Sequence, residues 1–471
     1  MNDSVTRPFF ASLALAVLLS ACSNATPPPD SGLQAPARWH SPALYSASGQ
    51  QQWWHSFGSA ELDRLIAEAQ AGSHDVAAAA ARVRQARAAA VAAAGPLLPE
   101  ATGSLDASRQ KQLRRNRYVE DGDDGDRESV SYAAGLSASY ELDFWGGNAA
   151  ARDSALAALR ASEFDQGTIT LTLLGNVADA YLRAQAYGEQ LRLATLNLAN
   201  AQRILDLVRA KYEAGSATAL ELEQQEILVA GQQRRLPSIE QQAGEARITL
   251  AALLGRPVQD LRLETGRFDD IRVPPAEAGL PSELLTRRPD VANAEALLAA
   301  AHADVQVARA AMLPRVVLTA SLGSASDIAA DLLRSPFYNL AAGITAPIFD
   351  NGRLRAERDR AQAFEDELLA TYRRTLVDAF SDVEKALNDA AWLDRQQRWQ
   401  RIELEHAQRA FDIAQTRYQA GAELLLNVLD AQRTLYESQD QGVQLQLQRL
   451  QASVDLYKAL GGGWQVAGEY E

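Results

Sequence analysis

The stretch that decides the fold lies between residues 130 and 143 and reads VSYAAGLSASYELD. Apolar and small residues alternate with small or polar ones, which is the period of a β-strand with one apolar face. We expect this strand near 129–143, and the same alternation predicts strands near 100–109, 314–323 and 337–347. Each is about ten residues long with aromatic residues near its ends, as in strands that cross a membrane at a tilt. The pattern predicts four membrane strands, with a soluble sheet packed on helices as the alternative.

Four strands are too few to close a barrel, and this limit predicts an assembly. An open strand edge in lipid leaves backbone groups unpaired, at several kcal/mol each. Two copies of the chain would give about eight strands, too narrow for an open pore, whereas three would give about twelve. We therefore expect a homotrimer that shares one barrel.

The chain contains an internal duplication. The motif from Tyr212 to Gly215 returns from Tyr418 to Gly421, and each copy contains two of the alternating segments. A prolonged match in register of this kind is the signature of repeated structural units. The predicted organisation is a signal peptide at 1–21, a lipidated tether at 22–52, a first repeat at 53–255, a linker at 256–282, a second repeat at 283–464 and a tail at 465–471.

The remaining sequence predicts long coiled-coil helices. No proline occurs between Gly352 and Tyr418, so one helix could extend roughly 100 Å at 1.5 Å per residue. The heptad positions in the first copy are Leu191, Leu198, Leu205 and Tyr212. Small residues in the same seam predict close helix packing, and an ordinary helical bundle without a lumen is the alternative. We expect Trp392 and Trp399 to pack between helices.

The N-terminus reads as an export signal. Arg7 is followed by an apolar run over 9–19, which is too short for a permanent membrane helix. The run ends in Leu-Ser-Ala before Cys22, the chain's single cysteine, and resembles a bacterial lipoprotein signal. Cys22 is therefore the predicted lipid attachment site, and an ordinary signal peptide with a chance cysteine is the alternative. Ser23, where an Asp would favour inner-membrane retention in that family, favours the outer membrane.

Composition and motifs exclude several classes of function. Lys and Arg total 46 against 60 Asp and Glu, and the net charge of -14 argues against nucleic-acid binding. One cysteine allows no intramolecular disulfide or thiolate metal cage, and the five histidines lack metal-ligand spacing. There is no phosphate loop and no serine nucleophile elbow. We expect no enzyme activity, no catalytic residue, no cofactor and no metal site.

Taken together, the motifs resemble the TolC-like outer-membrane efflux factors, in particular the lipoprotein subgroup of OprM and NodT type. The resemblance covers roughly residues 53–464 and rests on the duplicated helix and strand plan, the turns YELDFWG at 140–146 and APIFDNG at 346–352, and the two hairpins. It implies a mainly α protein with membrane β: a trimeric, twelve-stranded barrel in the outer membrane that continues into a coiled-coil periplasmic tunnel. Such a duct passively carries drugs, toxic compounds or secreted metabolites. A lipid-anchored coiled-coil scaffold without a pore is the alternative.

The resemblance also implies partners. A periplasmic adaptor protein would meet the hairpin tips, and an inner-membrane pump would drive export. The tip residues are Gly215, Gly421, Tyr212 and Tyr418. The lipoprotein subgroup favours a pump of the proton-driven resistance–nodulation–division class, with an ATP-driven exporter as the alternative.

A gate is the last implied feature. Asn427 and Asp430 are three residues apart and share a helix face after the second hairpin. In the family this face lines the closed periplasmic end, where two acidic rings are common. Asn427 departs from that pattern, which leaves Asp430 as the expected single ring, with a solvated surface residue as the alternative.

Overall fold

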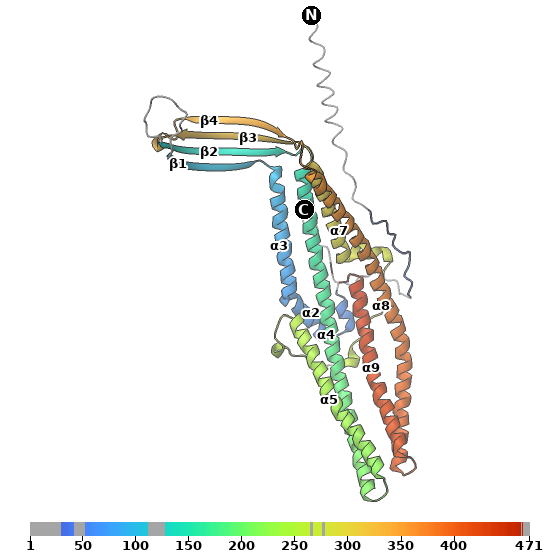
Figure 1. The fold of residues 1–471 in the computed structure, drawn as a ribbon. Coiled ribbons are helices and arrows are strands. Elements are labelled where there is room, and N and C mark those ends of the chain that lie inside the picture. The colour runs from blue at the N-terminus through green and yellow to red at the C-terminus, as the bar shows by residue number, and fades with distance from the viewer. Residues whose placement is uncertain are drawn as a thin grey trace, which may run out of the picture.

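The computed structural model describes residues 30–41, 52–111, 128–263, 267–275, 278–462 and 464. The predicted signal peptide, the lipid attachment site Cys22 and the C-terminal tail lie outside the described residues. The molecule is elongated: a four-stranded sheet projects from one end of a helical body, and two long helical hairpins reach its other end (Figure 1).

The elements repeat in order. The first half contains η2 (Trp53–Phe57), α2 (Ala60–Gly72), α3 (His74–Ala94), η3 (Gly95–Leu97), β1 (Glu100–Lys111), β2 (Glu128–Leu142), α4 (Gly147–Glu213) and α5 (Ala219–Leu253). Between the halves lie η4 (Val258–Asp260), η5 (Phe268–Asp270), η6 (Pro281–Glu283) and α6 (Leu284–Arg287). The second half contains α7 (Pro289–Ala310), β3 (Arg315–Ser326), η7 (Ala329–Asp331), β4 (Pro336–Thr345), α8 (Arg353–Gln419) and α9 (Leu425–Ala459). Since α4 and α8 both have 67 residues and α5 and α9 both have 35, the two copies have kept their helix lengths.

The two longest helices begin with the same local device. Gly146 and Gly352 have φ of 72° and 82°, a left-handed conformation that favours glycine. The Asp143 carboxylate accepts hydrogen bonds from two amides in the first turn of α4, at 3.1 and 2.8 Å. Asp350 accepts from the amides of Gly352 and Leu354 at the start of α8. Each strand-to-helix turn therefore satisfies helix amides that would otherwise lack partners.

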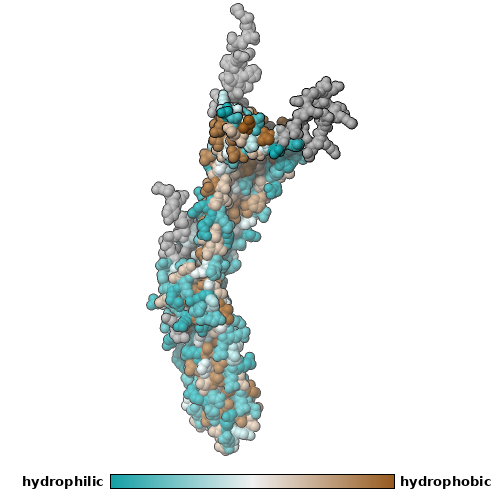
Figure 2. Space-filling model, turned by 90° about the vertical axis from the view of Figure 1, so that its left-hand side faces the viewer, coloured by the Kyte–Doolittle hydropathy of each residue, from teal (hydrophilic) through white to brown (hydrophobic). Residues whose placement is uncertain are grey.

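The sheet is antiparallel throughout, in the order β1-β2-β3-β4. One face carries the large apolar side chains, all exposed: Leu105, Leu136, Leu318, Leu322, Tyr338, Leu340 and Ile344. The other face carries mainly small and polar side chains, with Val317 and Phe337 as exceptions, and its row Thr102, Ser137, Ser321 and Asn339 crosses all four strands. The Thr102 and Ser137 hydroxyls are 2.7 Å apart. Figure 2 shows hydrophobic residues gathered at the sheet end and hydrophilic ones predominating on the opposite end of the helical body. The apolar face suits lipid and the polar face suits water.

The helical body has its core between paired helices. In the lower part of the molecule, Ala201, Leu205, Phe411 and other residues of the predicted seam are buried in one cluster. The tryptophans do not follow the prediction. Trp392 and Trp399 are 54% and 73% exposed, and the Arg395 guanidinium lies over the Trp392 ring. The absence of proline predicted the helix that carries them, but both positions are exposed to solvent in the single chain.

Candidate channel gate and membrane sheet

Both hairpins turn on a glycine. Gly215 and Gly421 have φ of 74° and 76°, and no atom would meet a Cβ at either position within 4 Å. The Ser216 amide donates to the Lys211 carbonyl, and the Ala422 amide donates to the Arg417 carbonyl, each at 2.8 Å. These bonds, which span five residues, satisfy carbonyls at the helix ends. Backbone conformation, not side-chain space, is therefore what requires glycine at both tips.

The two tip tyrosines differ. Tyr418 is 5% exposed and belongs to the core cluster between the hairpins, whereas Tyr212 is 43% exposed. Lys211 Nζ donates to the Tyr418 carbonyl at 2.8 Å and lies 3.9 Å from the centre of its ring. Burial, with the nearby Glu221 carboxylate, raises the pKa of Tyr418. Lys211 thus ties the end of α4 to the end of α8.

The predicted gate residues occupy the first turns of α9. Asn427 and Asp430 are both exposed in the single chain. Asn427 Nδ2 donates to the Glu423 carboxylate at 2.6 Å, and Arg417 Nε lies 3.3 Å from the other Glu423 oxygen. These contacts and the Leu424 amide lower the pKa of Glu423. Sequence reasoning missed Glu423, although its spacing of four from Asn427 was a usable signal.

The Asp430 carboxylate stands apart from these contacts. In the described part of the chain no basic group lies within ion-pair distance of it, and only its backbone carbonyl accepts a side-chain bond, from Thr434. A carboxylate on an exposed helix face is free to meet copies of itself in an assembly. The geometry therefore leaves Asp430 available for an axial ring.

A buried polar network joins the hairpins next to the predicted gate residues. Tyr436 OH donates to the Asn197 carbonyl at 2.9 Å and accepts from Gln432 Nε2 at 2.7 Å. Asn197 Nδ2 donates to Gln439 Oε1 at 2.9 Å. Burial raises the pKa of Tyr436 to about 12. Because a buried polar group without partners is costly, this network fixes the register of α4 against α9.

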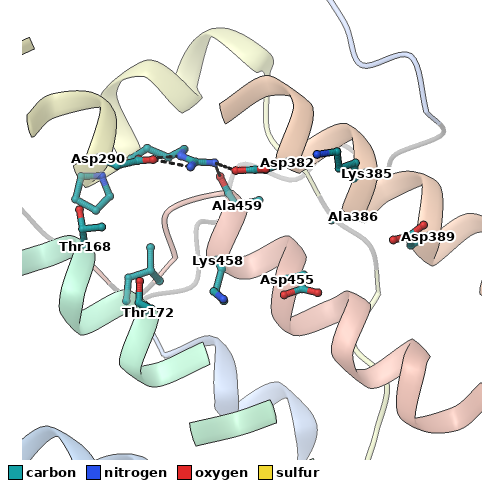
Figure 3. A pocket seen from close by; sticks show the side chains of 13 residues that line it. Thr168, Thr172, Asp290, Asp382, Lys385, Ala386, Asp389, Asp455, Lys458 and Ala459 are labelled. Carbon is teal, nitrogen blue, oxygen red and sulfur yellow. Dashed lines mark hydrogen bonds and ion pairs between the residues drawn. The ribbon is translucent and has the colours of Figure 1, made fainter. Parts of the chain in front are cut away.

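A cavity of about 450 Å³ lies where α4, α7, α8 and α9 meet (Figure 3). Arg288 is 9% exposed and bonds to Asp290 at 2.6 Å, Asp382 at 3.2 Å and the Ala459 carbonyl at 3.3 Å. The rest of the lining includes lysines, further aspartates, threonines and small apolar side chains. Arg288 therefore clamps three helices, a structural role. Among the described residues, no three potential ligands stand close enough together to hold a metal ion.

The sheet leaves two edges open. Within the described chain, β1 and β4 each pair with one neighbour only, so each presents an unpaired edge. No helix in the described ranges is both long and apolar enough to cross a bilayer.

Comparison with known proteins gives a consistent result. The chain matches the family model described as "Outer membrane efflux protein" over residues 65–256 and 280–462. It is 57% identical over 456 residues to the pyoverdine export outer membrane protein OpmQ of Pseudomonas aeruginosa, covering 96% of each chain. It is 30% identical over 471 residues to the antibiotic efflux pump outer membrane protein ArpC of Pseudomonas putida, covering 98% of this chain and 96% of ArpC.

Solved structures agree with the sequence relatives. The outer-membrane channel OprN superposes with a TM-score of 0.85 at 28% identity, covering 93% of this chain and 99% of OprN. The open-state MtrE outer membrane channel of Neisseria gonorrhoeae gives a TM-score of 0.82 at 27% identity, with 93% and 97% coverage. The similarity thus extends over the sheet and both hairpins.

Proposed function

Since the chain belongs to the outer membrane efflux protein family and is the outer-membrane channel component of a tripartite efflux or export system, we propose that its cargo is pyoverdine. The predicted fold class, a trimeric β-barrel with four strands per chain continuing into a helical tunnel, is confirmed. The protein lies in the outer membrane and extends into the periplasm. The scaffold without a pore is therefore set aside.

The cargo proposal rests on one observation: identity to a protein named for pyoverdine export is 57% over nearly the whole chain, against 30% for a protein named for antibiotic efflux. Deleting the gene should lower pyoverdine in the medium severalfold and raise it in the periplasm. Supplying OpmQ should restore export. Unchanged pyoverdine together with lost antibiotic tolerance would instead assign drug efflux, the second candidate, which the ArpC match favours.

A homotrimer is the assembly that the sheet supports. The open edges of β1 and β4 would pair between neighbouring chains, so that three chains close about twelve strands with no edge left in lipid. The face that carries Thr102 and Ser137 would line the water-filled interior. Native mass spectrometry in detergent should show the trimer, and a dominant monomer that still inserts into membranes would contradict the shared barrel.

Asp430 is the proposed gate ring, with Asn427 beside it on the same exposed face. Three carboxylates around a narrow axis repel one another and attract cations. Asp430→Ala should weaken cation preference and block by multivalent cations in single-channel recordings. Gln224→Ala, on the corresponding turn of α5, is the matched control. Unchanged selectivity and block in Asp430→Ala would remove Asp430 from the gate.

The hairpin tips are the proposed contact with a periplasmic adaptor protein. Tyr212 is exposed beside the Gly215 turn and is available for docking. Tyr418 packs inside its own chain, so beside Gly421 its expected role becomes support of the tip. Site-specific photocrosslinking from position 212 should capture the adaptor, whereas crosslinking from position 418 should not.

Two further proposals concern the anchor and the pump. Cys22 is the proposed attachment point for lipid, palmitate included, because it is the only thiol. Cys22→Ala should abolish fatty-acid labelling.

The resistance–nodulation–division class of pump is supported only by resemblance to the lipoprotein subgroup and stays a prediction. Export that stops with an uncoupler but survives loss of the pump's ATPase activity would support it, and the reverse would assign an ATP-driven exporter.

A further inference from the structure

The order of strands and helices fixes which helices meet when barrel edges pair. Within one chain, α4 follows β2 and α7 precedes β3, and α4 packs against both α7 and α9. In the same way α8 follows β4, and α3 precedes β1. The helix α5 lies below α3 as α9 lies below α7 (Figure 1). Pairing of β4 with β1 of the next chain therefore places α8 against α3 and α5 of that chain, in the arrangement that α4 has with α7 and α9.

The internal duplication gives the register of this contact. Because α4 and α8 have equal lengths, as do α5 and α9, each residue of one repeat has a counterpart in the other. Trp392 and Trp399 of α8 are the counterparts of Ala186 and Leu193 of α4. Ala186 is 2% exposed in a core cluster that includes residues of α9, and Leu193 packs against the same cluster. The two exposed tryptophans thus occupy positions that are covered in the first repeat.

The matching surface lies on α5. The residues that α9 contributes to the core cluster or packs against it include Val443, Leu447, Leu450 and Val454. Their counterparts, here called the α5 strip, are Pro237, Gln241, Gly244 and Ile248. Ile248 is 56% exposed, and no atom would meet a Cβ at Gly244 within 4 Å. The α5 strip is therefore open in the single chain.

Large and small side chains exchange places between the two contacts. Counted from the hairpin tips at about 1.5 Å per residue, Trp392 lies level with residues 244–248 of α5, as Ala186 does with residues 450–454 of α9. A glycine inside a helix costs about 1 kcal/mol relative to alanine. Gly244 leaves room for an indole ring where the leucine of α9 leaves room only for a methyl group. The sizes on the two surfaces are therefore complementary.

Charge agrees with this pairing. Nearer the tips, Asn197 of α4 donates to Gln439 of α9 at 2.9 Å. The counterparts are Glu403 on α8 and Gln233 on α5, and Arg234 follows Gln233. Glu403 and Arg234 are both exposed, and neither forms an ion pair within the described chain. Contact between chains brings this carboxylate to the same level as this guanidinium, which favours association.

We propose that Trp392 and Trp399 of α8 dock on the α5 strip of a second copy of this chain. This rests on the proposed homotrimer. Since the open edge of β4 leads directly into α8, the docking extends the contact between chains from the barrel into the helical tunnel. Each chain gives one pair of tryptophans and receives another, so three equal contacts seal the tunnel wall at this level.

Photocrosslinking from α5 tests the position of the docked helix. A photoreactive amino acid in place of Gln241 in the full-length protein should yield a covalent dimer on a denaturing gel, with the link on residues 392–402 of the second chain by mass spectrometry. Gln242 is the matched control. Its counterpart Gln448 is exposed although α9 packs against both α4 and α8, so position 242 should yield no dimer. Dimer from both positions alike, or linked elsewhere, would overturn the docking.

An exchange of sizes tests the contact itself, with trimer dissociation on heating as the measurement. Trp392→Ala and Gly244→Leu should each speed dissociation about tenfold or more, the first by emptying the contact and the second by overfilling it. The double variant recreates the small and large pair of α4 and α9 and should return toward the wild-type rate. Ile402→Ala should change nothing, because the counterpart Leu196 is 50% exposed.

The outcomes separate the docking from the assembly. Additive losses in the double variant, in a protein that still forms trimers, would overturn the docking alone. A wild type that native mass spectrometry shows to be monomeric would overturn the homotrimer and the docking with it.

Discussion

The two helical hairpins have equal lengths but different tips. The first tip is complete in itself: the Thr218 side chain accepts from the Glu221 amide while the Glu221 carboxylate accepts from the Thr218 amide, a capping box at the start of α5. In the second tip the N-cap residue of α9 is Leu424, whose side chain cannot cap the helix. Its order comes instead from the Glu423 carboxylate.

The tyrosines repeat this contrast. Tyr212 is exposed, while Tyr418 is buried against the other hairpin and its carbonyl is held by Lys211. A duplicated unit has thus diverged into one self-capped tip and one tip held by its Glu423 carboxylate and by Lys211 of the first hairpin. The second tip carries Asp430, so the proposed gate lies on the tip whose order depends on these side-chain contacts.

The largest expected difference concerns the tyrosines. Tyr418→Ala should cost about 3–5 kcal/mol because it empties a buried aromatic site, whereas Tyr212→Ala should cost less than about 1 kcal/mol. Thermal unfolding followed by circular dichroism measures both. Tyr418→Phe is the sharper control. Its hydroxyl is buried with no hydrogen-bond partner, so removing it should be neutral or stabilising. Equal losses for the two alanine variants would contradict the asymmetry.

The tie between the tips comes next. Lys211→Met removes the ammonium from the Tyr418 carbonyl and ring and should weaken the tip by about 1–2 kcal/mol. We expect higher single-channel conductance, because the two hairpins of one chain can then separate. Arg209→Met breaks only the exposed pair with Glu226, so it should leave conductance unchanged. Matching behaviour of the two variants would mean that Lys211 does not hold the tip closed.

The caps can be exchanged. Thr218→Ala should destabilise the first tip by about 1 kcal/mol, and Leu424→Thr should stabilise the second by a similar amount, since a threonine hydroxyl can accept the Asn427 amide. Local hydrogen exchange in the first turns of α5 and α9 reports each change. If Leu424→Thr slows exchange in the first turn of α9 and lowers conductance, the absence of a side-chain cap on α9 is what lets the proposed gate open. If exchange does not change, Glu423 already provides the stabilisation that a cap would add.

Sequence patterns identified the features governed by local rules. Strand alternation, the turn at Gly215 and the long helix from Arg353 all follow from backbone period, glycine geometry or the absence of proline. The candidate gate was reached through motif resemblance, without its Glu423 partner. The packing of Trp39 in the core of the second repeat could not be foreseen, because its partners lie hundreds of residues away in the chain. The absence of proline predicted the helix that carries Trp399 but could not tell which of its faces has a neighbour within one chain.

The smallest expected effect is a pH dependence confined to the second tip. The Asn427 amide, the Leu424 backbone amide and Arg417 hold the pKa of Glu423 below its ordinary value of 4.5. A depressed carboxyl pKa means that these contacts contribute fully above 4.5 and are lost as the pH falls through the lower folded value. Protonation then leaves Asn427 and Arg417 without their anionic partner, and the start of α9 loosens.

Single-channel conductance recorded from neutral to acidic pH tests this effect. Wild-type conductance should rise modestly once the pH falls below 4.5, and Glu423→Gln should already have the higher value at neutral pH and stay flat. Every other acidic group is present in both proteins, so the difference between the two curves isolates Glu423. Glu221→Gln, in the self-capped tip, is the matched control. It should weaken the first turn of α5 without changing the pH profile of conductance. Parallel curves for wild type and Glu423→Gln would mean that the second tip is held by Lys211 and packing alone.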